Sequence, residues 1–218
     1  TSIGYPVIIK AVSGGGGKGM RLVNDESQLE KSFNMAKIEA EAAFSDSNVY
    51  IEKYLDKPRH IEIQILCDNF SNIIPLGERE CSLQRRHQKI LEESPSCIMT
   101  DSLREKLYNS SIKACKAVNY VGAGTIEYLV DSEFNYYFME MNTRIQVEHP
   151  VTELVLGIDL IKNQILCHAN IPLSKEKLDS IKIRGHSIEC RINAENTMKN
   201  FMPSPGKITS LHLPGGIG

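Results

Sequence analysis

A dense polar run between a strand and a helix, from Tyr136 to Pro150, most constrains what this chain can fold into. Side chains alternate along a strand, so the β-rich start of the run would place Phe138, Glu140 and Asn142 on one side. Further polar residues follow mostly at alternate positions: Arg144, Gln146, Glu148 and His149. Pro150 has no N–H to donate and suits the first turn of the helix expected next. The run is therefore typical of the edge of a site.

Composition indicates a globular protein. The chain has 218 residues, of which 41% are hydrophobic, enough for one substantial core or two small ones. A net charge of −2 gives no reason to expect nucleic acid as a partner, although the run Arg85–Lys89 is basic and favours a local anion. No apolar run approaches the roughly 20 residues that a membrane span needs, so no membrane association is expected.

The six cysteines form no Cys-x-x-Cys motif, and several lie in apolar segments. This pattern predicts reduced, buried thiols in an intracellular protein, in the cytoplasm or, in a eukaryote, in a plastid or mitochondrion. Both ends of the sequence look cut from a longer chain, because no Met precedes the first strand and a turn ends the last segment.

A glycine loop lies between two short predicted strands, residues 7–10 and 20–23. Its glycines 14, 16 and 19 match G-x-G-x-x-G, but a dinucleotide-binding or Walker A loop should pass directly into a helix, and Walker A also needs Gly-Lys-Ser/Thr. A strand, a glycine loop and a second strand instead predict a hairpin lid whose N–H groups close over polyphosphate. The alternative is an ordinary glycine turn.

The other patterns predict a mixture of helices and an antiparallel sheet, which is an α+β fold. Helical spacing and N-caps predict helices over residues 25–43, 100–118, 150–155 and 158–168. Further strands are predicted over residues 49–55, 59–66, 73–76, 121–130, 136–140 and 182–195, with a closing strand after the proline-rich bend that begins at residue 201.

Two segments carry polar residues at strand spacing. In the half-buried strand 59–66, isoleucines would face inward, so His60, Glu62 and Gln64 would share the other face. Residues 77–89 are polar enough for a solvated loop. If the chain is extended there, Gln84, Arg86 and Gln88 lie on one side and Arg85, His87 and Lys89 on the other, and such clustered cations need a facing anion.

Strands 121–130 and 136–140 are predicted to form a hairpin that brings Glu127 close to Glu140. Two adjacent carboxylates in an apolar sheet raise each other's pKa unless a cation lies between them. Oxygen ligands with an amide nearby favour Mg²⁺ over zinc, so this pair predicts a metal site. A surface pair of charges is the alternative.

The order of motifs resembles that of the biotin carboxylases, which are ATP-grasp enzymes, over essentially the whole chain. The matching strings are Val-Ile-Ile-Lys, Gly-Gly-Gly-Gly-Lys-Gly-Met-Arg, Glu-Lys-Tyr-Leu, Pro-Arg-His-Ile-Glu-Ile-Gln, Gln-Arg-Arg-His-Gln-Lys, Glu-Met-Asn-Thr-Arg-Ile-Gln-Val-Glu-His-Pro-Val-Thr-Glu and Glu-Cys-Arg-Ile-Asn-Ala-Glu. The resemblance implies a partial ATP-grasp lid subdomain over residues 1–55 and a C-terminal catalytic subdomain over residues 56–218.

The resemblance also implies a reaction. ATP phosphorylates bicarbonate to carboxyphosphate, and the CO₂ released carboxylates biotin on a carrier protein, as in the first half-reaction of acetyl-CoA carboxylase in fatty acid synthesis. By similarity, the residues around ATP are Lys10, Gly15, Gly16, Gly17, Glu52, Lys53, Leu55, His60, Gln84 and His87. Those holding Mg²⁺ (or Mn²⁺) are Glu127 and Glu140, with Asn142 nearby. Those around bicarbonate and biotin are Lys89, Arg144, Gln146, Val147, Glu148 and Arg191.

In this interpretation Glu148 is the base that deprotonates bicarbonate, and Arg144 steadies that anion and the developing biotin enolate. Implied partners are the biotin carboxyl carrier protein or domain, a second copy of the parent enzyme and a carboxyltransferase subunit. The alternatives are a carbamoyl-phosphate-synthetase-like or other ATP-grasp ligase, and an ATP-binding module without catalysis. The sequence alone does not specify the final carboxyl acceptor.

Overall fold

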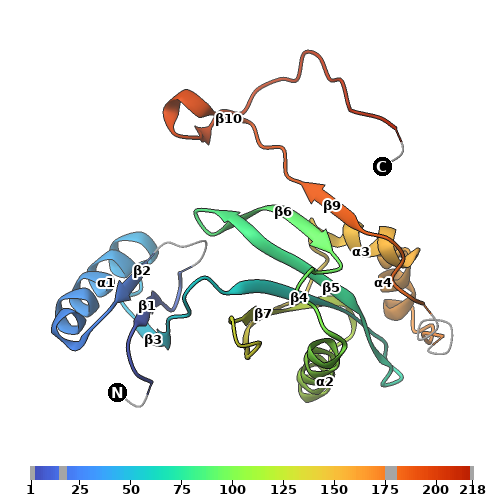
Figure 1. Cartoon of the computed structure of the whole chain (residues 1–218), viewed down its shortest axis with the longest axis horizontal. Helices are drawn as coiled ribbons and strands as arrows, with labels where there is room; N and C mark the ends of the chain where they lie inside the picture. Colours follow the sequence, from blue (N-terminus) through green and yellow to red (C-terminus); the bar gives the residue numbers. More distant parts are fainter. Residues whose placement is uncertain (1–2, 15–18, 175–180, 217–218) are drawn as a thin grey trace.

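Two separate antiparallel sheets dominate the fold in the computed structural model, which describes residues 3–14, 19–174 and 181–216 (Figure 1). The helices and strands are β1 (Val7–Ala11), β2 (Met20–Val23), η1 (Glu26–Gln28), α1 (Leu29–Phe44), β3 (Val49–Lys53), β4 (Arg59–Cys67), β5 (Ile73–Arg85), β6 (Gln88–Ser94), α2 (Asp101–Ala117), β7 (Gly122–Val130), β8 (Tyr136–Asn142), α3 (His149–Leu156), α4 (Leu160–His168), β9 (Ser187–Cys190), β10 (Glu195–Asn196), η2 (Thr197–Lys199) and β11 (Met202–Pro203). This confirms the predicted α+β class.

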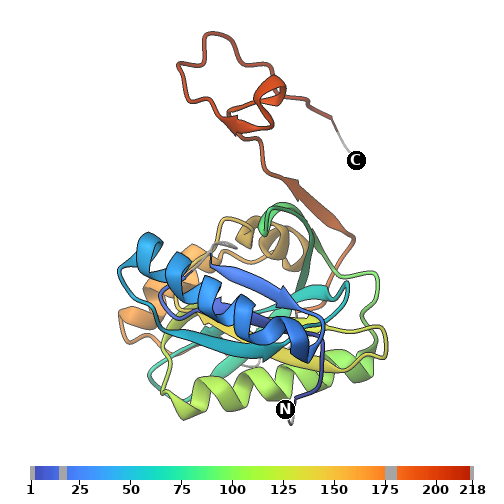
Figure 2. The same cartoon turned by 90° about the vertical axis from the view of Figure 1, so that its left-hand side faces the viewer.

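The smaller sheet has the strand order β2-β1-β3, and helix α1 covers one of its faces (Figure 2). The predicted hairpin is confirmed: β1 and β2 pair antiparallel, with Lys10 opposite Met20. Val7, Ile9, Val23 and Ala36 form its buried core. Because Ile9 points into this core, Lys10 on the same strand points away from it.

The larger sheet has six strands in the order β8-β7-β4-β5-β6-β9. Helix α2 covers one face, where Ile61, Ile63 and Tyr128 pack with Leu103 and Leu107. Thr100 caps α2, since its hydroxyl accepts a hydrogen bond from the Leu103 amide. Helix α4 packs on the other face through a second cluster. Helix α3 ends at Gly157 in the left-handed conformation, so the predicted break between the two short helices is confirmed.

Strand β4 differs from the prediction because both its faces are buried. His60, Glu62 and Gln64 do share one face, but Glu62 and Gln64 are almost completely inaccessible. The reason is that side chains of β5 and α3 cover this face, as the hydrogen bonds of Arg79 to Glu62, Gln64 and Thr152 show. The strand therefore carries a buried polar layer rather than a solvated one.

The polar run 77–89 forms neither a solvated loop nor one continuous extended segment. It completes β5, turns at Arg86 and His87, and starts β6. Both turn residues have positive φ, which fits a tight two-residue hairpin. The turn reverses the alternation, so Gln84 pairs with Lys89 and Arg85 with Gln88. The predicted division into two alternating sets is therefore wrong.

A register shift also corrects the predicted face of Phe138. Glu140 pairs with Glu127, but Phe138 pairs with Tyr128, the neighbouring residue on β7. Adjacent strand residues point to opposite faces, so Phe138 is aligned with the core side and Glu140 with the polar side. Its ring meets Tyr128 edge-on, with 6.4 Å between the ring centroids.

The C-terminal segment leaves the sheets after β9 and is mostly exposed (Figures 1 and 2). The predicted strand 182–195 shrinks to β9 and the first residue of β10, and the short β11 lies within the proline-rich bend. No strand follows the bend in residues 204–216, so the predicted closing strand is wrong there. All six cysteines are free, but Cys97 and Cys190 are exposed, contrary to the prediction of buried thiols. Among the described residues, no helix is long and apolar enough to cross a membrane.

Candidate functional site

A cleft of about 800 Å³ opens between the two sheets, and it gathers the predicted site residues that the structure describes. They come from seven places in the chain: Lys10, Glu52, Lys53, Leu55, His60, Gln84, His87, Lys89, Glu127, Glu140, Asn142, Arg144, Gln146, Val147, Glu148 and Arg191. Gly15, Gly16 and Gly17 lie outside the described residues.

Glu127 and Glu140 are direct partners on neighbouring strands, as the sequence predicts. The Asn142 side-chain amide bridges them, donating to Glu127 Oε1 at 2.9 Å and to Glu140 Oε1 at 3.2 Å. Glu127 is buried, whereas Glu140 is exposed to the cleft. Two carboxylates thus converge, and oxygen ligands of this kind suit Mg²⁺.

A cation does stand beside this carboxylate pair. Burial raises the pKa of Glu127, but hydrogen bonding to His60 and the charge of Lys89 outweigh burial, so the pKa lies below its usual value. His60 Nε2 is 2.8 Å from Glu127 Oε2. The sequence predicted a raised pKa for adjacent carboxylates unless a cation is nearby. Such cations are present, and the pKa of Glu127 is not raised.

Lys89 lies at the centre of three buried carboxylates. Its Nζ contacts Glu62, Glu127 Oε1 at 2.9 Å and Glu148 Oε1 at 2.8 Å. Burial lowers the pKa of this ammonium, but the three negative charges raise it above the ordinary value overall. Lys89 therefore remains a fixed positive charge on the floor of the cleft.

Glu148 is held from its other side by Arg191. The guanidinium donates from Nη2 to Glu148 Oε2 at 2.9 Å and from Nε to Glu92 Oε1 at 2.6 Å. Glu148 is almost completely buried, just before the first residue of α3. Arg144 also lines the cleft but is exposed, and its Nη1 donates to the Ile145 carbonyl at 3.2 Å. Arg191 and Lys89, rather than Arg144, are thus the cations in contact with Glu148.

The opposite wall of the cleft is formed by β1 and β3 with the segment after β3. Lys10 and Glu52 form an ion pair across the two strands. On the side of the large sheet, His60 lies between Gln84 and the carboxylates: the Gln84 amide nitrogen is 3.0 Å from His60 Nδ1. Burial lowers the pKa of His60, but Glu127 and Glu62 raise it to about 9 overall. Cationic side chains thus occur along the whole cleft.

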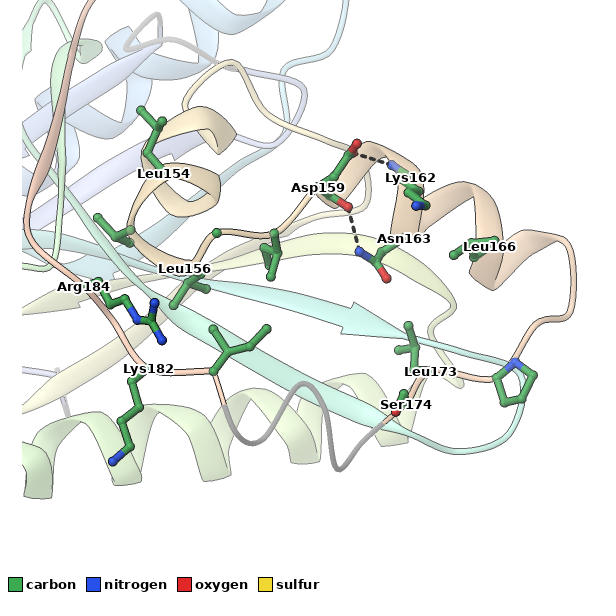
Figure 3. Close-up of a pocket in the computed structure, with 15 residues that line it drawn as sticks. Leu154, Leu156, Asp159, Lys162, Asn163, Leu166, Leu173, Ser174, Lys182 and Arg184 are labelled. Atoms are coloured by element: carbon green, nitrogen blue, oxygen red, sulfur yellow. Dashed lines mark hydrogen bonds between the residues drawn. The ribbon is translucent and has the colours of Figure 1, made fainter.

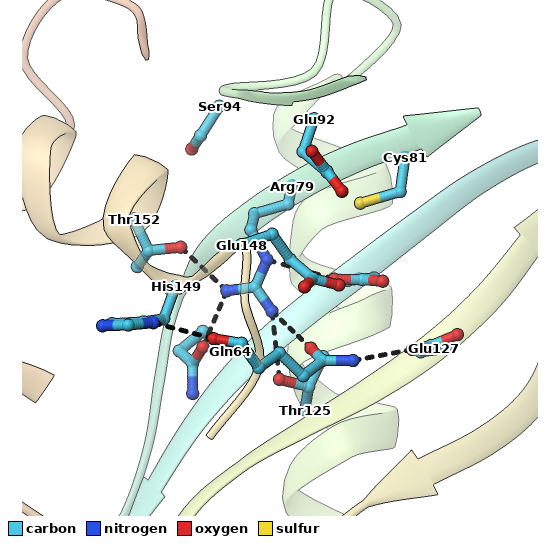
Figure 4. A network of polar contacts seen from close by, with 12 residues as sticks. Gln64, Arg79, Cys81, Glu92, Ser94, Thr125, Glu127, Glu148, His149 and Thr152 are labelled. Atoms are coloured by element: carbon cyan, nitrogen blue, oxygen red, sulfur yellow. Dashed lines mark hydrogen bonds and ion pairs between the residues drawn. The ribbon is translucent and has the colours of Figure 1, made fainter. Parts of the chain in front are cut away.

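Two residues behind the cleft were not predicted to have a role: Glu62 and Arg79, of which Arg79 is labelled in Figure 4. Both are fully buried, and Arg79 Nε donates to Glu62 Oε2 at 3.1 Å. Glu62 in turn holds Lys89. The alternation of polar residues on two consecutive strands was a usable signal, because antiparallel neighbours place such faces side by side.

A second hollow of about 930 Å³ lies beside α3 and α4 (Figure 3). Asp159, in its wall, caps α4 by accepting a hydrogen bond from the Lys162 amide at 2.7 Å. Its backbone carbonyl accepts another from the Asn163 side chain at 2.7 Å. These contacts belong to helix capping, and this hollow is lined by none of the predicted site residues that the structure describes.

Comparisons with known proteins identify the family of this chain. Residues 1–176 match the family described as carbamoyl-phosphate synthase L chain, ATP binding domain. Biotin carboxylase 1 of Bacillus subtilis is 56% identical over 217 residues, which are 99% of this chain and 48% of that protein. A pyruvate carboxylase subunit of Methanothermobacter thermautotrophicus is 55% identical over 100% of this chain and 44% of its own length.

Solved structures show the same fold. A biotin carboxylase from Campylobacter jejuni, described as a β-γ-ATP complex, has a TM-score of 0.91 and 53% identity, covering 99% of this chain and 48% of that one. The biotin carboxylase domain dimer of Hydrogenobacter thermophilus 2-oxoglutarate carboxylase, with MgADP, ADP and bicarbonate, has a TM-score of 0.90 and 47% identity, covering 100% and 48%.

This chain therefore spans about half the length of the relatives that it matches. Its similarity to them extends over nearly all of its own residues. The chain belongs to the family of carbamoyl-phosphate synthase L chain ATP-binding domains, and its predicted resemblance to the biotin carboxylases and their ATP-grasp fold is confirmed.

Proposed function

We propose that the protein catalyses the ATP-dependent carboxylation of biotin, with bicarbonate as the carboxyl source. The observation that carries this proposal is that one cleft holds both a carboxylate pair suited to a metal and a buried glutamate gripped by two cations. The first set suits a metal-bound polyphosphate, and the second suits a small anion that must lose a proton. Relatives described with ATP, MgADP and bicarbonate support the same assignment.

Glu127 and Glu140, with Asn142 between them, fit Mg²⁺ or Mn²⁺ because they supply oxygen donors from adjacent strands. Mg²⁺ held there would offset the negative charge of the nucleotide phosphates during the transfer. In the nucleotide half of the cleft, we assign phosphate contacts to Lys10 and the glycine loop, including Gly15, Gly16 and Gly17. We assign contacts with adenine to Glu52, Lys53 and Leu55. His60, Gln84 and His87 are assigned to other parts of the nucleotide.

We assign the proton transfer to Glu148. Its carboxylate takes the bicarbonate proton, and the resulting oxyanion attacks the γ-phosphorus while the bond to ADP breaks, giving carboxyphosphate. Lys89, Arg191 and Arg144 supply positive charge to the anions, and Gln146 and Val147 bound the same space. Carboxyphosphate then breaks down to CO₂ and phosphate; the phosphate takes the N1 proton of biotin, and N1 forms its new bond to CO₂.

The finer predictions from the sequence belong to this proposal. They are the biotin carrier protein or domain, a carboxyltransferase, a homodimeric parent enzyme, a cytoplasmic or organellar location, and the two subdomains divided at residue 55. The resemblance suggests the first half-reaction of acetyl-CoA carboxylase, but the relatives also include a pyruvate carboxylase subunit and a 2-oxoglutarate carboxylase domain. Supplying the purified complex with each acceptor in turn would distinguish them by the carboxylated product.

The decisive experiment measures ADP release by the full-length protein with bicarbonate and free biotin. We expect Glu148→Gln to lower bicarbonate-dependent ATP cleavage by at least about a hundredfold, the usual contribution of a positioned base, while the Kd for ATP is unchanged. Glu93→Gln is the matched control, because Glu93 of β6 pairs with His186 and does not line the cleft.

Turnover that survives Glu148→Gln would contradict the assignment of the base. Two further outcomes would favour the alternatives. ATP cleavage that requires ammonia would indicate a carbamoyl-phosphate-synthetase-like ligase, and ATP binding without bicarbonate-dependent cleavage by the wild-type protein would indicate a binding module.

A further inference from the structure

Arg79 lies behind the proposed bicarbonate site and has no exposed surface. It sits on β5, directly opposite Glu62 of β4 in the sheet register. Removing an arginine from water costs several kcal/mol unless its charge and its hydrogen-bond donors find partners. A buried arginine therefore needs partners for its donors as well as for its charge.

The five N–H donors of the Arg79 guanidinium all meet acceptors. Nε donates to Glu62 Oε2 at 3.1 Å. Nη1 donates to Gln64 Oε1 at 2.6 Å and Thr152 Oγ1 at 3.0 Å. Nη2 donates to Thr125 Oγ1 at 3.0 Å and Gln146 Oε1 at 2.8 Å (Figure 4). A planar fork with every donor used has one orientation, and the three donors of a lysine could not reproduce it.

This arrangement fixes the side-chain amide of Gln146. Because Arg79 donates to Oε1, the amide nitrogen must point the other way, and it donates to Glu127 Oε1 at 2.9 Å. Gln146 also lines the cleft. Without Arg79 the amide could rotate by half a turn and present its carbonyl oxygen to the carboxylates and to any entering anion, which is repulsive.

The same guanidinium holds the start of α3. Thr152 lies in the first turns of that helix, and Glu148 immediately precedes the helix. Arg79 therefore ties both Gln146 and Thr152 to the central strands, one on each side of Glu148. A carboxylate that must meet a small substrate within hydrogen-bond distance benefits from such fixed supports.

We propose that Arg79 is a positioning residue for bicarbonate: it orients the Gln146 amide with its N–H donor toward the cleft and holds Glu148 in place through Thr152. This inference rests on the proposed function. Arg79 has no contact with the cleft itself, so it acts only through these neighbours.

Arg104 provides a matched control. It pairs with Glu78 of β5, which is fully buried like Glu62, through Nε at 2.9 Å and Nη2 at 2.8 Å. Arg104 belongs to α2, on the opposite side of the sheet from the cleft, and it does not line the cleft. A merely structural role for Arg79 predicts that Arg79→Lys and Arg104→Lys behave alike.

The experiment uses the full-length protein and measures the KM for bicarbonate, the Kd for ATP and the Tm. For Arg79→Lys we expect the bicarbonate KM to rise about tenfold or more, the weight of one hydrogen bond to an anion, with the ATP Kd nearly unchanged. For Arg104→Lys we expect a lower Tm but a bicarbonate KM within about twofold of wild type.

A double-mutant cycle tests the route through Gln146. Once Gln146→Ala has removed the amide, adding Arg79→Lys should raise the bicarbonate KM much less than it does in the wild-type background. If Arg79→Lys does not fold, Thr152→Val removes one acceptor of the fork and should give a smaller rise in the same KM.

Equal KM effects of the two lysine variants, or fully additive effects of Arg79→Lys and Gln146→Ala, would overturn the inference. In the fallback, a Thr152→Val protein with a lower Tm and an unchanged bicarbonate KM would overturn it as well. Failure of the proposed function looks different, because the wild-type protein would then show no bicarbonate-dependent ATP cleavage.

Discussion

Lys89 and Arg191 illustrate how single residues prepare this cleft for anions. Each contacts a different oxygen of Glu148, and each is also held by a further buried glutamate, Glu62 or Glu92. Burial raises the pKa of Glu92, and the nearby charge of Glu148 adds to that rise, although Arg191 opposes it. Positive groups fixed before the substrate arrives need little reorganisation when charge develops.

His60 gives a pH-dependent prediction at this scale. Its folded pKa of about 9 lies above the usual 6.5, so its contribution to stability is complete below pH 6.5 and disappears as pH rises through 9. We expect His60→Gln to lower the Tm most at pH 6, and the difference from wild type to shrink steadily toward pH 9.5. Thermal scans across this range measure the effect.

His212→Gln is the control for the His60 variant. His212 lies in the exposed C-terminal segment, and we expect this substitution to leave the Tm profile unchanged. A Tm difference for His60→Gln that grows with pH would show that the imidazole is neutral in the folded protein, and that its carboxylate contacts do not stabilise the charged form.

At the scale of elements, sequence patterns identified segments well wherever one face was apolar. The stripe containing Leu103 and Leu107 predicted α2, and alternation predicted the β7–β8 hairpin with Glu127 beside Glu140. The prediction failed for β5, because residues such as Arg79 are polar yet buried. Their burial depends on acceptors contributed by β4, β7 and α3, and no local pattern contains that information.

The junction between α3 and α4 gives a second prediction. Gly157 ends α3 with φ of 65°, and an added Cβ would meet no atom within 4 Å, so Gly157→Ala introduces backbone strain without a clash. We expect destabilisation by about 1–2 kcal/mol, the cost of the left-handed conformation for a residue with a Cβ. Urea unfolding followed by circular dichroism measures it.

Gly206→Ala is the matched control for that substitution. An added Cβ there also meets no atom within 4 Å, but Gly206 does not have a positive φ. Its unfolding free energy should stay within about 0.5 kcal/mol of wild type. If the two alanine variants were equally stable, the left-handed conformation of Gly157 would not make a side chain there destabilising.

For the whole molecule, the main consequence of the fold is a cleft between two sheets that have separate cores. The residues in it come from both ends of the chain, from Lys10 to Arg191, and their convergence could not be derived from spacing alone. The motif resemblance predicted the set of residues. That Glu62 pairs with both Lys89 and Arg79 was seen only in the structure, because these contacts depend on the register of β4, β5 and β6.

This arrangement predicts that a metal-bound nucleotide links the two sheets and stabilises the whole protein. A ligand that binds only the folded state raises its stability by about 2.7 kcal/mol at a hundred times its Kd. We therefore expect ATP with Mg²⁺ to raise the Tm of the full-length protein more than ATP with EDTA does. Glu140→Gln should remove most of this metal-dependent increment.

Glu133→Gln should keep the increment, because Glu133 is an exposed residue of the β7–β8 turn outside the cleft. Both substitutions remove one negative charge from the same hairpin, so a general change in charge cannot explain a difference between them. If Glu140→Gln retained the full Mg²⁺-dependent rise, the metal would not depend on the Glu127 and Glu140 pair. The nucleotide would then be held across the sheets by cations alone, chiefly Lys10, Lys89 and the imidazolium of His60.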